Sequence, residues 1–280
     1  MLIKKILFGY FVFAVLSGIG LAAWKTVLML RYYDPYNNEY VSEAGSSLRS
    51  LGIAVFVIFM ILATSLIVLK KADFRRFSAS DHQFSVFTSA LLGFVFLAVG
   101  ILLSLYFRAF VGIHLNPLYR CVQILTYLLS FSCAAYFVLN ATGQPKFEQA
   151  KKLLAVLTPL FGITFLLSSY LNPAYNYRDY DHTLCNVAIC ALVFFLLYDT
   201  KTVVTGQATP AYFMFSLISL VASAVYMIPT FVLLAYWELS ANLNHVCEAV
   251  LFGAIFYTCA CLVNLCRSAQ RKEIPEQTEA

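Results

Sequence analysis

The residues of this chain that are best suited to hold a metal ion form two pairs, each with a spacing of three. His182 precedes Cys185, and His245 precedes Glu248. Residues three apart lie on one face of a helix, and imidazole, thiol and carboxyl groups are ligands of zinc and similar transition metals. If the two helices adjoin, these pairs predict a four-ligand site. The alternative is two ordinary polar first turns, since an acidic side chain is favoured at a helix N-terminus.

A second set of polar residues lies inside or at the ends of apolar segments, where an ionisable side chain usually serves a function. The set that we predict to bind a ligand is Lys25, Arg120, Asn186, Tyr226 and Glu248. Because Lys25 and Glu248 fall at similar depth, we also expect them to form an ion pair. The alternative for Lys25, Arg120 and Glu248 is that their side chains extend along the helix to water, although the shorter side chain of Glu248 reaches less far.

Eight apolar runs carry these residues and take up most of the 280-residue chain. A helix rises about 1.5 Å per residue, so about 20 residues cross the hydrocarbon core of a bilayer. Each run reaches that length or nearly so. The runs cover residues 7–30, 51–69, 84–107, 118–139, 153–171, 183–198, 211–236 and 244–266. We therefore predict an all-α, polytopic integral membrane protein with eight transmembrane helices. Residues 1–267 form one transmembrane domain, and residues 268–280 form a short polar cytoplasmic tail.

The composition agrees with this class. Hydrophobic residues make up 61% of the chain and charged residues only 12%, whereas about 25% of residues are charged in soluble proteins. The net charge of +5 follows from basic residues that flank the runs, so it does not indicate nucleic-acid binding. The eight cysteines lie within or at the edges of the runs without a Cys-x-x-Cys pair, which predicts small packing residues.

The basic residues predict the orientation of the chain. The ends of the runs alternate between two sides, and thirteen of the 19 lysines and arginines fall on the side that holds both termini. Since basic residues are retained in the cytoplasm, we expect both termini to be cytoplasmic and the protein to lie in the plasma (cytoplasmic) membrane. The basic, apolar start of the chain resembles a secretory signal peptide. The first apolar run continues to Leu30, however, and we expect a retained helix.

Small residues recur at intervals of four on two of the runs. Ala14, Gly18 and Ala22 do so on the first, and Ser89 and Gly93 on the third. Such spacing lets helices approach closely in lipid. The sequence leaves open whether the partner is a helix of the same chain or a second copy.

The runs as assigned contain no Asp, Glu, Lys, Arg or His near their middle. Ion-coupled carriers usually place an ionisable group there. The chain also has no His-Glu-x-x-His motif and no Gly-x-x-x-x-Gly-Lys loop, which argues against a metalloprotease and against nucleotide hydrolysis.

These observations favour a small-solute permease, or the membrane subunit of a transporter, with an outward-facing polar pocket among the first, fourth, sixth and eighth runs. The first alternative is a membrane sensor or receptor-like protein, or an assembly partner protein, and the second is a metal-dependent membrane enzyme. We expect the lipid bilayer and a small-molecule ligand as partners, and no nucleic acid. A partner subunit or a homo-oligomer stays open. We expect no cofactor, with zinc or a similar metal as the alternative.

Overall fold

The computed structural model describes residues 2–34, 39–70, 72–74, 83–109, 116–171, 180–237 and 243–271. Within these residues, eight helical segments are long and apolar enough to span a membrane, which confirms the predicted all-α, multi-pass class. The helices are α1 (Leu2–Tyr32), α2 (Gly45–Ala63) with its short continuation α3 (Ser65–Val68), α4 (Gln83–Ala109), α5 (Pro117–Thr142), α6 (Glu148–Leu171), α7 (Tyr180–Thr205), α8 (Pro210–Trp237) and α9 (Leu243–Ser268).

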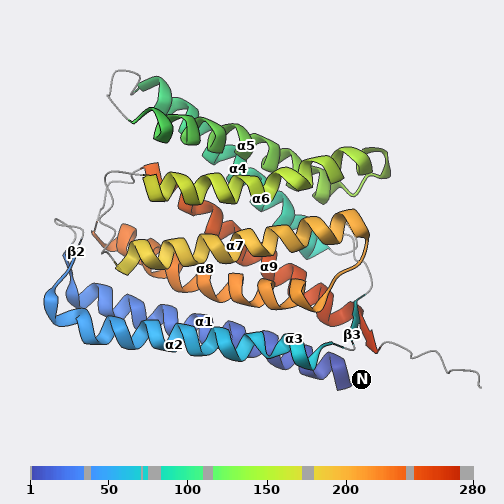
Figure 1. The fold of residues 1–280 in the computed structure, drawn as a ribbon, viewed down its shortest axis with the longest axis horizontal. Coiled ribbons are helices and arrows are strands. Elements are labelled where there is room, and N and C mark those ends of the chain that lie inside the picture. Colours follow the sequence, from blue (N-terminus) through green and yellow to red (C-terminus); the bar gives the residue numbers. More distant parts are fainter. Residues whose placement is uncertain are drawn as a thin grey trace, which may run out of the picture.

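Six of the helices form a closed ring. Each helix from α4 to α9 packs against the next one in the chain, and α9 packs against α4. Helix α1 packs against α8, and α2 lies beside α1 at the edge of the bundle farthest from α5 (Figure 1). The ring therefore consists of three consecutive helical hairpins, with α1 and α2 added to one side.

Aromatic side chains fill the interior of the ring. The Phe96 ring of α4 stacks on Phe137 of α5 with ring centroids 5.5 Å apart, and it meets Phe161 of α6 edge-on at 4.9 Å. Tyr257 of α9 contacts Phe137 at 5.0 Å and Phe195 of α7 at 6.0 Å. We call these five residues the aromatic core. Edge-to-face and offset contacts of this kind add to the stabilisation that burial provides.

The small residues singled out above pack within the chain. A Cβ atom at Gly18 would lie 3.5 Å from the Cβ atom of Ala224, so α1 and α8 approach closely there. The Ser89 hydroxyl donates to the Phe137 carbonyl at 2.9 Å, and a Cβ atom at Gly93 would lie 3.3 Å from a backbone oxygen of α5. These small residues therefore allow α1 to pack closely on α8, and α4 on α5.

Both termini of the described chain lie at one end of the bundle, which we call the termini end. Lys4 Nζ donates to the Arg267 carbonyl oxygen at 2.7 Å. Strand β3 (Ala72–Phe74) pairs antiparallel with β4 (Ala269–Arg271), with Ala72 opposite Arg271 (Figure 1). Part of the predicted tail thus belongs to α9 and β4, and residues 272–280 lie outside the described residues. At the opposite end, the far end, β1 (Tyr33–Asp34) pairs with β2 (Glu39–Tyr40).

Candidate functional site

A buried polar cluster lies at the far end, and Lys25 is its centre. The Lys25 side chain is 0% exposed, and its Nζ atom lies 2.7 Å from Oδ1 of Asp181 on α7. The same Nζ atom lies 4.9 Å from the ring centroid of Tyr226 on α8. An ion pair and a cation–π contact together compensate the buried charge.

Lys25 forms its ion pair with Asp181, and no ion pair joins it to Glu248 among the described residues, so the predicted pair of Lys25 with Glu248 is wrong. Helix α7 begins at Tyr180, three residues before the run predicted there. This earlier start brings Asp181 into the first helical turn, where a carboxylate is favoured by the helix dipole. Tyr40 also donates to both carboxylate oxygens of Asp181 at 3.2 Å.

Glu248 belongs to the same cluster through another contact. Its side chain is 1% exposed, and its Oε1 atom accepts a hydrogen bond from the Cys185 thiol at 3.8 Å. Asn186 binds Nε2 of His182 at 3.1 Å and accepts from the Ser169 hydroxyl of α6 at 3.0 Å. Helices α1, α6, α7, α8 and α9 all contribute to this far-end cluster.

Four of the five residues predicted to bind a ligand therefore gather at the far end, namely Lys25, Asn186, Tyr226 and Glu248. Arg120 does not join them. It is exposed at the start of α5, which packs against α4 and α6 and lies at the edge of the bundle opposite α1 and α2 (Figure 1).

The predicted metal ligands are only partly described. His182, Cys185 and Glu248 lie in the far-end cluster, but the side chain of His245 lies outside the described residues. Within the part of the chain that the structure describes, no three His, Cys, Asp or Glu side chains form a group able to hold a metal ion. The four-ligand site stays a prediction.

A second buried cluster surrounds Asp199 near the termini end. The Asp199 side chain is 4% exposed. Its Oδ1 atom accepts a hydrogen bond from Tyr212 of α8 at 2.8 Å. Its Oδ2 atom accepts from Tyr136 of α5 at 2.9 Å and from Tyr257 of α9 at 3.4 Å. One carboxylate of α7 is thus held by hydroxyl groups from three other helices.

The two remaining ring helices complete this Asp199 cluster. The Asn140 amide of α5 donates to the Tyr257 hydroxyl and to the Ser89 hydroxyl of α4, at 3.3 Å each. Lys151 of α6 is close enough to attract the Asp199 carboxylate electrostatically. Helices α5, α7, α8 and α9 therefore meet at this one acidic side chain, and α4 is joined to it through Asn140 and Tyr257.

Sequence reasoning missed Asp199 because the predicted run ended one residue before it. Helix α7 instead continues to Thr205, and the carboxylate is accommodated there by the three tyrosines. The buried positions Ala188, Leu192 and Phe195 recur at intervals of three and four before Asp199. If this pattern of buried positions is continued by one helical turn, it reaches Asp199, so the sequence pattern predicts that Asp199 is buried.

The two acidic residues of α7 face the same way. Asp181 and Asp199 are five helical turns apart, so their side chains leave the same face of the helix about 27 Å from each other at about 1.5 Å per residue. Helix α7 thus presents one acid to the far-end cluster and one to the Asp199 cluster, with part of the aromatic core between them.

No protein-family model, curated protein or solved structure matches this chain.

Proposed function

We propose that the protein is a small-solute permease, or the membrane subunit of a transporter, and that its solute is a small cation. The observation that carries this proposal is the Asp199 carboxylate of α7, which is buried in the six-helix ring and accepts hydrogen bonds from tyrosines of α5, α8 and α9. Ionisable side chains inside membrane spans usually mark the path of a solute or ion.

A purely structural role explains this cluster less well than solute binding. Burying a carboxylate is costly, and apolar side chains of similar volume hold helices together at least as well. Tyrosine hydroxyls both donate and accept hydrogen bonds. The three hydroxyls around Asp199 therefore suit a cation site. When a cation or a cationic group contacts the carboxylate, a tyrosine hydroxyl can stop donating its hydrogen to Asp199 and offer its oxygen to the cation instead.

The balance of buried charges favours a cation over an anion. Among the described residues, the far end holds the buried acid Glu248 and the part-buried acid Asp181 beside one buried lysine, Lys25, and Asp199 adds a further acid on the same face of α7. A path along the ring would thus meet acidic groups at both ends. By the basic-residue bias, the far end faces outward, so that Lys25, Asn186, Tyr226 and Glu248 lie at the outer entrance.

Flux measurements on purified protein in liposomes test this proposal. We expect vesicles with protein to accumulate radiolabelled sodium, rubidium or methylammonium faster than protein-free vesicles. Labelled sulfate and mannitol, as an anion and a neutral solute, should enter both kinds of vesicle equally slowly. Cation entry at the protein-free rate, or equal acceleration of sulfate, would contradict the proposal.

A further inference from the structure

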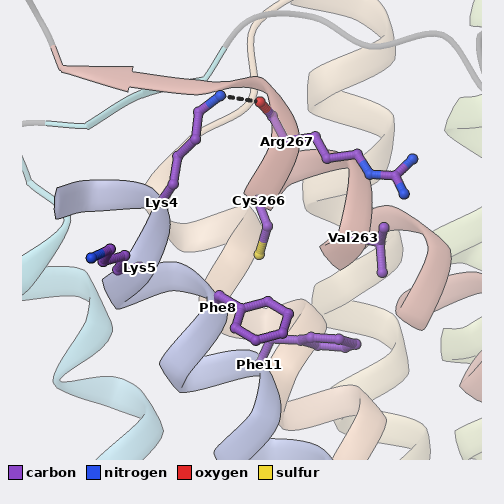
Figure 2. Close-up of a pocket in the computed structure, with 7 residues that line it drawn as sticks. All are labelled: Lys4, Lys5, Phe8, Phe11, Val263, Cys266 and Arg267. Carbon is purple, nitrogen blue, oxygen red and sulfur yellow. Dashed lines mark hydrogen bonds between the residues drawn. The ribbon is translucent and has the colours of Figure 1, made fainter. Parts of the chain in front are cut away.

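A groove of about 570 Å³ lies at the termini end between the first turns of α1 and the last turns of α9 (Figure 2). Its inner wall is apolar and is formed by Phe8 and Phe11 of α1 and by Val263 and Cys266 of α9. The groove opens at the ends of two helices that are long and apolar enough to span a membrane.

The rim of the groove is basic. Lys4, Lys5 and Arg267 line it, and all three are exposed. The Lys4 ammonium donates to the Arg267 backbone carbonyl at 2.7 Å, which fixes the two helix ends against each other (Figure 2). Among the described residues, no carboxylate forms an ion pair with any of these three side chains.

A further described lysine lies at the termini end. Lys70 is exposed at the end of the α2–α3 span. The pairing of β3 with β4 brings the segment that follows Lys70 next to the residues that follow Arg267. Lys70 thus adds an exposed positive charge at the same end of the bundle as the rim, whereas the wall of the groove itself is apolar.

We propose that this groove binds an anionic phospholipid from the surrounding leaflet. The rim cations contact the headgroup phosphate, and an acyl chain lies along the wall formed by Phe8, Phe11 and Val263. A phospholipid is the ligand whose charge and apolar length match this combination. Basic residues near a membrane surface attract anionic lipids by about a factor of five for each side chain. A soluble anion would satisfy the rim but leave the apolar wall empty.

Native mass spectrometry tests this proposal on protein purified in detergent and supplied with phosphatidylglycerol or phosphatidylcholine. We expect one phosphatidylglycerol to stay bound per chain, and phosphatidylcholine to be lost. The Lys4→Gln, Lys5→Gln double variant should weaken phosphatidylglycerol retention by about tenfold or more. The matched control, Lys146→Gln with Lys201→Gln, neutralises two exposed lysines that do not line the groove and should retain the lipid.

A variant of the wall separates lipid binding from attraction of any anion. Val263→Trp fills the groove and leaves all rim charges in place, so it should release the phospholipid as the double lysine variant does. It also keeps the proposal testable if loss of the Lys4 contact prevents folding. Equal retention of both lipids, equal loss in the control variant, or displacement of the lipid by millimolar inorganic phosphate would overturn the proposal.

Discussion

Both oxygens of the Asp199 carboxylate accept hydrogen bonds, and this explains how an acid is tolerated inside a membrane-spanning helix. A buried ionised group without partners is very unfavourable. The three tyrosine hydroxyls provide the partners that water would provide outside the membrane. Because these hydroxyls come from three helices, the position of Asp199 depends on the packing of the whole ring.

Lys25 pairs with the Asp181 carboxylate at 2.7 Å, and this leads to a stability prediction. Replacing Lys25 by Met removes this ion pair, which we expect to destabilise the protein by about 3–5 kcal/mol. The double variant Lys25→Met, Asp181→Asn should recover part of this loss. Thermal unfolding in detergent measures both effects.

The exposed pair of Lys152 and Glu148 provides the control for this prediction. Its atoms lie 3.2 Å apart with both side chains accessible, so Lys152→Met should cost only about 0–1 kcal/mol. If Lys25→Met and Asp181→Asn are strictly additive, the two side chains do not stabilise each other and the far-end ion pair is contradicted.

The residue types in the sequence indicate some of the side chains that belong to the far-end cluster, but not which of them pair with each other. The sequence singles out Lys25 and Glu248, because charges within apolar runs stand out. It does not identify Asp181 as the partner of Lys25, since Asp181 lies just before the predicted run. The sequence also gives no sign that Arg120 lies apart from the cluster, because the distance between Arg120 and the cluster depends on how α5 packs. Such assignments require the three-dimensional arrangement of the helices.

Helix packing depends on positions where a side chain is absent. Gly162 of α6 faces α7 so closely that an added Cβ atom would lie 2.6 Å from Cγ2 of Val193. Val193 is β-branched and stiff at χ1, so it yields little. The contact of α6 with α7 lies within the ring that surrounds Asp199, which ties helix packing to the candidate site.

Gly162→Ala should therefore lower stability by about 1–3 kcal/mol, the usual cost of overpacking a filled interior. Gly20→Ala in α1 is the matched control, because a Cβ atom there has no neighbour within 4 Å. The two variants are compared by thermal unfolding in the same detergent. Equal melting temperatures would contradict the close packing of α6 on α7.

The existence of the helices was predictable, while their ends were not. Apolar runs of membrane-spanning length predict all eight spans, because lipid requires a helix to satisfy its own backbone. The helices extend beyond the apolar runs to include polar residues such as Asp181 and Asp199, and a search for apolar runs leaves such residues out. These residues are accommodated by partners on other helices. Both clusters lie at such helix ends, and this is why the sequence located them incompletely.

At the scale of the whole molecule, the basic-residue bias predicts that the termini end faces the cytoplasm. A membrane-impermeant maleimide applied to intact cells checks this orientation. In a Cys121→Ser background, which removes one exposed thiol, Ser46→Cys at the far end should be labelled. Gln207→Cys at the termini end should be labelled only after the membrane is opened. Labelling of Gln207→Cys in intact cells would show that the termini end faces outward and would contradict the predicted orientation.

The central claim is that the Asp199 carboxylate inside the six-helix ring binds the transported cation. Cation entry into proteoliposomes, compared between the wild type and Asp199→Asn, tests it most directly. We expect Asp199→Asn to reduce the rate by about tenfold or more, as loss of a buried charge contact does. Glu148→Gln, which neutralises an accessible acid of α6, should keep the wild-type rate. Folded Asp199→Asn protein that transports cations as fast as the wild type would contradict the claim.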